Sequence, residues 1–187
     1  MPPAPSFLGS WLVSEYIYNP DSSFAGINYQ RRMLHQLENG LIRVTQICAP
    51  EPVLDTHPMG AFRGEWVFDL RVDGNTRHYL GPDVVGAGQM LAEGVMKGQG
   101  RWPRFGYDFT SFSILVNPNY QFTGGQFLDG ERMVANLIGL AVPETEKREY
   151  PHFSTPQWPA AMAATLQKPT AERLLDLQTQ LQRNAPN

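Results

Sequence analysis

The run from Phe7 to Tyr18 constrains the fold more than any other stretch of the sequence. Side chains along a β-strand point alternately to two faces, so Trp11 and Glu15 share one face of this run. Gly9, two residues before Trp11, leaves room on the same face for the large indole ring. The run therefore predicts a first strand whose tryptophan fills the floor of a β-barrel.

The composition favours one small all-β domain. A chain of 187 residues can bury a complete core as one domain. The 17 glycines and 16 prolines, with aromatic residues at 11%, fit short strands joined by many turns better than a helical bundle. We therefore expect one domain with tails.

The charge pattern and the cysteine content argue against several kinds of partner. The formal net charge is -3 and there is no basic stripe, which argues against nucleic acid. The single cysteine, Cys48, leaves no Cys-rich zinc pattern, and the histidines are too far apart for a metal motif. No apolar run approaches the ~20 residues that span a bilayer, and the start lacks a signal-peptide pattern. We predict a cytoplasmic protein with no cofactor, and ligation of a metal or haem by a lone histidine stays open.

Asn39-Gly40 predicts a tight hairpin between the runs Phe24 to Leu37 and Leu41 to Ala49. A two-residue turn at this position places Met33 opposite Gln46 and Arg31 opposite Cys48. The more apolar face of the hairpin should point inward. That face carries Arg31, Met33, His35, Leu37, Ile42, Val44, Gln46 and Cys48.

Further turn signals divide the rest of the chain into strands. Asp73-Gly74 predicts a second hairpin, and Asn117-Pro118-Asn119 a third. The glycine-rich stretch 86–100 favours short, bent strands, and the run 132–142 favours a last strand or a short helix. The irregular stretch 50–60 has the length of a flap over a barrel mouth.

The end of the chain has a helical pattern. The runs 158–166 and 170–183 predict two helices, and the second carries an apolar stripe of Leu174, Leu177 and Leu181 with Leu175. An isolated helix of this length is marginal in water, so the stripe must dock on the barrel or on a second subunit in a two-fold homodimer.

The motif Gly9-Ser10-Trp11, followed by this strand-rich layout, resembles the calycin superfamily of lipocalins and fatty-acid-binding proteins, whose first strand opens with Gly-x-Trp. The resemblance implies an all-β, antiparallel, calycin-like barrel of about eight to ten strands with C-terminal helices. We expect a flexible tail at residues 1–6, the barrel at 7–150 and a helical extension at 151–187. In lipocalins a late arginine lies against the first-strand tryptophan, and Arg132 is the nearest candidate here.

The predicted interior holds polar groups that need an explanation. If Trp11 points inward, Glu15 does too, and the first hairpin adds Arg31, His35 and Gln46. Burying a carboxylate and a guanidinium is costly unless they pair or meet a ligand. A Glu15 to Arg31 pair, or a register slip that turns these groups outward, is the structural explanation. The functional interpretation is that Arg31 and Gln46 fix a polar group of a ligand whose apolar body contacts Trp11, Met33, Trp66, Phe68, Tyr79, Phe112 and Phe122.

Three functions follow from this interior. The leading prediction is binding of a small hydrophobic molecule that buried polar groups orient. The first alternative is a cofactor-free isomerase, cyclase or lyase in the same cavity, in which Glu15 or His35 moves a proton and Arg31 stabilises an enolate-like charge. The second alternative is a protein assembly factor that grips its partner with the C-terminal helices. Cys48 is expected to be a core residue, with a thiol activated by a cation as the alternative.

Overall fold

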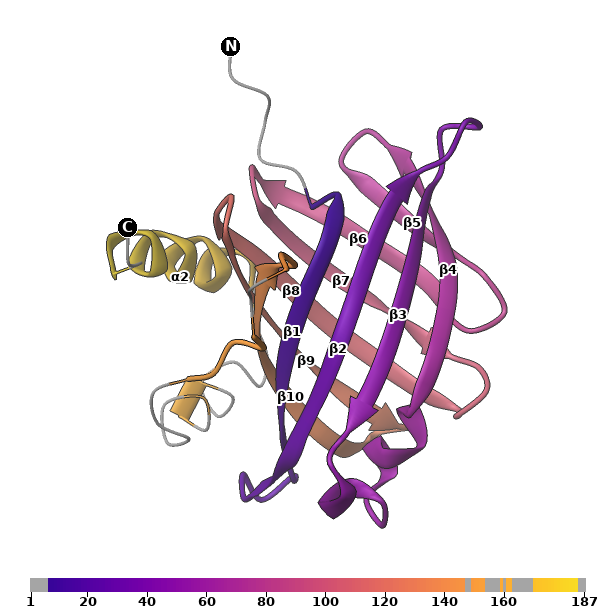
Figure 1. Cartoon of the computed structure of the whole chain (residues 1–187), viewed down its shortest axis with the longest axis vertical. Coiled ribbons are helices and arrows are strands. Elements are labelled where there is room, and N and C mark those ends of the chain that lie inside the picture. The colour runs from indigo at the N-terminus through magenta and orange to yellow at the C-terminus, as the bar shows by residue number, and fades with distance from the viewer. Residues whose placement is uncertain (1–6, 147–148, 154–158, 160, 163–169, 185–187) are drawn as a thin grey trace.

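The computed structural model describes residues 7–146, 149–153, 159, 161–162 and 170–184. Within these residues, ten antiparallel strands close into a barrel in which β1 pairs with both β2 and β10 (Figure 1). The strands are β1 (Gly9–Tyr18), β2 (Phe24–Gln36), β3 (Ile42–Pro50), β4 (Gly64–Asp73), β5 (Thr76–Leu80), β6 (Val85–Ala92), β7 (Val95–Trp102), β8 (Tyr107–Asn117), β9 (Tyr120–Asp129) and β10 (Arg132–Pro143). The predicted antiparallel barrel is confirmed.

The register of the first hairpin differs from the prediction by one residue. Leu34 pairs with Val44 and Arg32 pairs with Gln46, so β3 keeps its predicted inward face while β2 presents the opposite one. The cause is the turn. Gly40 adopts a φ of 80°, Gly40 N–H donates to Leu37 O at 3.0 Å, and Leu37 N–H donates to Leu41 O at 2.7 Å. These bonds close a three-residue loop, in which only the glycine needs a positive φ. A slip of one residue moves every side chain of a strand to the other face.

The register of the second hairpin also differs from the prediction, but the inward faces of its strands do not change. Asp73 pairs with Thr76, so the turn is Gly74-Asn75, one residue later than predicted. The pairing therefore shifts by two residues, and Leu70 and Tyr79 remain together on the inward face. The third hairpin and the last strand, β10, form as predicted.

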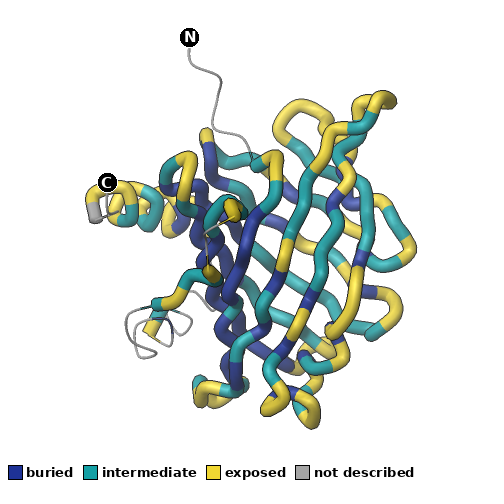
Figure 2. The backbone as a smooth tube through the Cα atoms, in the orientation of Figure 1, coloured by how far each residue is buried: buried dark blue, intermediate teal, exposed yellow. Residues whose placement is uncertain are grey.

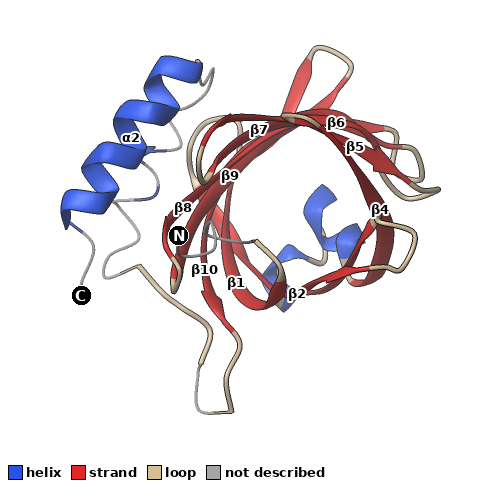
Figure 3. Ribbon diagram, turned by 90° about the horizontal axis from the view of Figure 1, so that it is seen from above, coloured by secondary structure: helices blue, strands red, loops and turns tan. Residues whose placement is uncertain are grey.

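The predicted flap is a packed plug. Two short 3₁₀ helices, η1 (Pro52–Leu54) and η2 (Pro58–Phe62), connect β3 to β4 and lie inside the ring of strands when the barrel is seen from above (Figure 3). Their buried side chains, Leu54, Met59 and Phe62, pack with Trp66 and Trp102 in one apolar cluster. One end of the barrel is therefore filled by side chains.

The C-terminal helix, α2 (Ala171–Asn184), lies outside the barrel against β7 and β8 (Figure 3). Leu174 is fully buried, with Leu177 and Leu181 packed around the same cluster, and Gln178 Nε2 donates to Glu93 O at 2.9 Å. Buried residues are concentrated on this side of the barrel (Figure 2). The other predicted helix, 158–166, lies mostly outside the described residues. No helix among the residues that the structure describes is both long and apolar enough to cross a membrane.

We predict that Leu174→Ala lowers the free energy of unfolding by about 2–5 kcal/mol, because it leaves a cavity between α2 and the barrel. The matched control is Leu175→Ala on the same helix, where the side chain is 36% exposed and the change should stay within about 0.5 kcal/mol. Urea denaturation measures both. Equal effects of the two substitutions would contradict the docking of α2 through Leu174.

Candidate functional site

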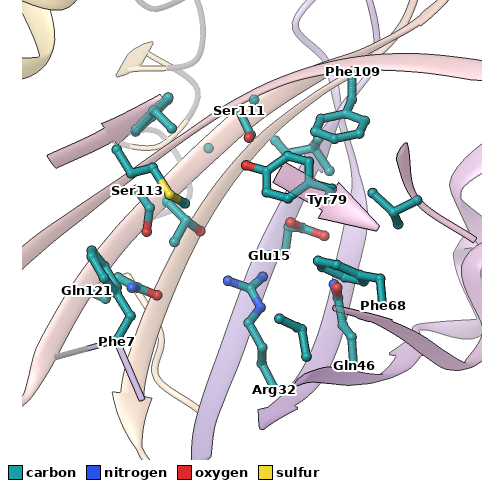
Figure 4. Close-up of a pocket in the computed structure, with 18 of the residues that line it drawn as sticks. Phe7, Glu15, Arg32, Gln46, Phe68, Tyr79, Phe109, Ser111, Ser113 and Gln121 are labelled. Carbon is teal, nitrogen blue, oxygen red and sulfur yellow. The ribbon is translucent and has the colours of Figure 1, made fainter. Parts of the chain in front are cut away.

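A cavity of about 200 Å³ lies inside the barrel, next to the plug. Residues predicted to face the interior line it, among them Trp11. Figure 4 shows four others, Glu15, Gln46, Phe68 and Tyr79. The remaining walls are mostly aliphatic and aromatic, with contributions from Leu34, Val44, Leu70, Val84, Met96, Phe109 and Phe127.

Inward glycines make room for the bulky residues around this cavity. Gly88 on β6 pairs with Gly98 on β7, and the Tyr79 hydroxyl lies over both. A Cβ at Gly98 would approach the Tyr79 oxygen closer than any real contact, so a larger residue there would displace the ring. The glycine-rich stretch therefore shapes the cavity.

A network of amide groups joins the charged groups of the interior. Glu15 Oε2 accepts hydrogen bonds from Gln30 Nε2 at 2.6 Å and from Asn28 Nδ2 at 3.2 Å. Gln30 Oε1 accepts in turn from Arg32 Nη2 at 3.0 Å and from Gln46 Nε2 at 2.7 Å. Glu15 and Arg32 form no direct ion pair, so the Gln30 amide connects them. β1, β2 and β3 supply all five side chains.

Burial shifts the pKa values of both charged groups. Desolvation raises the pKa of Glu15 above its ordinary value of 4.5, against the opposing effects of Arg32 and of the bonds from Asn28 and Gln30. Desolvation also lowers the pKa of the Arg32 guanidinium, and Glu15 opposes that shift. Each group therefore bears an electrostatic cost that the other relieves in part.

Arg32 retains unused hydrogen-bonding capacity. A guanidinium has five N–H donors. Among the described residues, the Arg32 guanidinium donates one hydrogen bond, to Gln30 Oε1. Its side chain points into the cavity (Figure 4). The remaining donors are thus available to a molecule inside the barrel.

The structure places three predicted site residues on the outside of the barrel, so their predicted inward orientation is wrong. The Arg31 side chain is 46% exposed, and its Nε donates to Glu144 Oε2 at 2.8 Å. Met33 and His35 alternate with the inward Arg32 and Leu34 and face away from the cavity. The one-residue slip of the first hairpin is the reason.

Two predicted aromatic residues lie away from the cavity, and a third lies at its edge. Trp66 packs in the plug, where its Nε1 donates to Phe62 O at 2.8 Å and Arg104 lies 5.2 Å from its ring centroid. Phe122 belongs to the outer cluster beneath α2 and does not line the cavity. Phe112 packs in the same outer cluster and borders the cavity. A ligand contact of Trp66 or Phe122 would need a rearranged core.

Trp11 occupies the predicted position for a different local reason. A Cβ on Gly9 would meet nothing within 4 Å, so the glycine leaves no special room for the indole; its φ of 108° is the feature that requires glycine. The Trp11 Nε1 donates to Phe7 O at 3.0 Å. Arg132 pairs with Asp129 on the surface, so the lipocalin pairing expected for it with Trp11 is not formed.

Cys48 is a core residue opposite Gln30. Burial raises the pKa of its thiol to about 12, which contradicts the alternative of an activated thiol. Within the described residues, no three His, Cys, Asp or Glu side chains gather where they could hold a metal ion.

The sequence pattern did not indicate the site residues that β2 contributes, which are Asn28, Gln30 and Arg32. The signal that could have found them is the tripeptide Glu38-Asn39-Gly40. A three-residue hairpin loop with glycine in the last place is the next most common connection after the two-residue turn, and it reverses the face of the preceding strand.

The fold of this chain occurs in solved structures. No protein-family model matches the sequence, and no curated protein matches it. A protein with unknown function from the DUF3598 family of Nostoc punctiforme has a TM-score of 0.57 and 12% identity, over 74% of this chain and 48% of that one. This chain therefore spans about half of its length. An S-type phycobiliprotein lyase from Guillardia theta has a TM-score of 0.55 and 10% identity, over 75% of this chain and 90% of that one. At these identities the likeness shows the calycin-like barrel fold alone.

We predict that Glu15 makes stability fall as the pH rises. Because its pKa is raised on folding, the protonated carboxyl contributes stability that is fully present below 4.5 and is lost as the pH rises through the folded pKa. Glu15→Gln should remove this part of the slope in urea denaturation measured across that window. Glu65→Gln, at an exposed position of β4, is the control and should keep the slope. An unchanged slope in Glu15→Gln would contradict the shift.

Proposed function

We propose that the barrel binds a compact, largely apolar molecule whose carboxylate or carbonyl group is held by Arg32. The observation that carries the proposal is the Arg32 guanidinium, which points into the cavity with most of its donors unused. A buried cation is retained at a cost, and hydrogen bonds to a charged group are among the strongest that a binding site offers. This assigns to Arg32 the role that the sequence pattern predicts for Arg31.

The rest of the cavity suits the apolar part of such a molecule. Phe68, Phe109 and Leu70 provide apolar contacts, and Gln46 adds an amide beside Arg32. The volume of about 200 Å³ is somewhat larger than the ~150 Å³ that holds benzene in an engineered protein core. The cavity therefore favours a single ring or a short acyl chain. Membership of the calycin superfamily is part of the same proposal.

A larger ligand is the second candidate. One structural neighbour is named a phycobiliprotein lyase, which brings a bilin into consideration for this chain. A bilin has four pyrrole rings and carboxylate side chains, so Arg32 could hold one of its carboxylates. Its size would require the cavity to widen, and we therefore favour the compact acid.

An enzymatic function and an assembly function have less support from the geometry. For an isomerase, cyclase or lyase, Glu15 stays in the cavity as the candidate proton carrier, whereas His35 and Arg31 lie outside it, and Gln30 stands between Glu15 and Arg32. An assembly factor would use the apolar face of the C-terminal helix, and Leu174 is already buried against this chain's own barrel. The two-fold homodimer stays a prediction.

We predict that Arg32→Met weakens binding of octanoic acid by about tenfold or more, because a hydrogen bond to a charged group is lost. The matched control is Arg31→Met, the neighbouring arginine that faces outward, and it should leave the affinity unchanged. Tryptophan fluorescence reports the titration, since Trp11 and Trp102 line the cavity.

Two further titrations make this experiment decisive. Wild type should bind octanol more weakly than octanoic acid. In Arg32→Met the two affinities should be equal. Biliverdin, followed by its absorbance, tests the larger ligand. Equal affinity of wild type and Arg32→Met for octanoic acid, or no binding of it to either protein, would overturn the assignment of Arg32.

A further inference from the structure

A second polar wall of the cavity lies on β8 and β9, away from Arg32. Ser113 on β8 and Gln121 on β9 line the cavity and are 7% and 4% exposed (Figure 4). In the barrel, β1 and β10 lie between β9 and β2, so these groups and Arg32 stand on different walls. They form no part of the network around Glu15.

The polar groups of this wall lack protein partners. No other described residue provides a hydrogen bond to the Gln121 amide or to the Ser113 hydroxyl. Thr123, which pairs with Ser113 across the two strands, has a fully buried Oγ1 without a partner among the described residues. Ser111 differs, because the Tyr79 hydroxyl bonds to it. A buried amide without a partner costs free energy, and buried polar side chains are as a rule satisfied by protein, water or ligand.

The chemistry of the wall defines what it can accept. An amide and a hydroxyl each donate and accept hydrogen bonds. Glu15 and Arg32 are the charged residues among those that line the cavity, so β8 and β9 offer no counter-charge. The wall therefore suits a neutral hydroxyl, oxo or amide group and disfavours a second ionised group.

We propose that Gln121 and Ser113 form a second subsite that hydrogen-bonds a neutral hydroxyl or oxo group of the ligand. Together with Arg32, this subsite makes the preferred ligand a compact hydroxy- or oxo-carboxylic acid with an apolar middle. The inference rests on the proposed role of Arg32 and adds the second functional group of the ligand.

Ordered water is the competing explanation, and it makes a different prediction. If water satisfied Gln121 and Ser113 fully, a hydroxyl on the ligand would gain nothing and would lose affinity through its own desolvation. A gain in affinity on adding a hydroxyl therefore requires a partner in the wall.

The test compares octanoic acid with the positional isomers of hydroxyoctanoic acid, each titrated into the full-length protein. We expect at least one isomer to bind wild type about three- to tenfold more tightly than octanoic acid, the range for one neutral hydrogen bond. Gln121→Leu should abolish this preference and leave the affinity for octanoic acid equal or higher. Gln99→Leu, at an exposed position of β7, is the control and should keep the preference.

Ser113→Ala removes one hydroxyl of the wall and serves as a second variant if Gln121→Leu does not fold. It should reduce the preference for the hydroxy acid over octanoic acid. The inference is wrong if every hydroxy isomer binds wild type no better than octanoic acid. It is also wrong if the preference survives in both variants. Failure of octanoic acid itself to bind wild type would instead reject the role of Arg32, and with it this inference, so the two failures are distinguishable.

Discussion

The Gln30 amide is the interaction on which the interior of this barrel depends. A carboxylate and a guanidinium inside an apolar shell would normally pair directly, and the pair would satisfy both. Here Gln30 donates to Glu15 and accepts from Arg32, which keeps the two charges apart. The charge of Arg32 still lowers the pKa of Glu15, against the larger effect of burial. Because Gln30 also accepts from Gln46, its oxygen is fully used. The arrangement leaves the outer donors of Arg32 directed at the cavity, and the proposed binding site exists for that reason.

The sequence predicts much of the barrel, but it places the β2 residues of this network on the outer face. Alternation along β1 correctly puts Trp11 and Glu15 inside, and the three hairpins form within one residue of the predicted turns. The inward face of β3 is also correct. The exception is β2, because Asn39-Gly40 fits two turn geometries that differ by one residue, and local propensity does not choose between them. The register is fixed by the pairing of β2 with both β1 and β3, which is long-range information that no local pattern encodes.

The rule that one face of an antiparallel strand is solvated also fails on one side of the barrel. Tyr16 and Tyr18 point outward on β1 and are nevertheless buried. The chain that follows β10 supplies part of the cover: Phe153 N–H donates to the Tyr16 hydroxyl at 3.2 Å and α2 adds Leu174 to the same cluster. Phe122 lies under this cover, which explains why its apolar character suggested a ligand contact that the fold does not provide. A residue buried on a covered outer face cannot be told from a lining residue by hydrophobicity.

The packing of the walls around the cavity depends on residues that have no side chain. At Gly98 on β7, Gly125 on β9 and Gly139 on β10, an added Cβ would meet neighbouring atoms at impossibly short distances. A larger residue at Gly98 would displace the Tyr79 ring, and one at Gly125 would push against the backbone of Thr110 on β8. The strand framework can be shared with structures only 10–12% identical, whereas the space and its polar groups belong to the particular sequence. The shared fold therefore supports the barrel architecture alone, and the proposed ligand is argued from Arg32, Gln30 and the residues of β8 and β9.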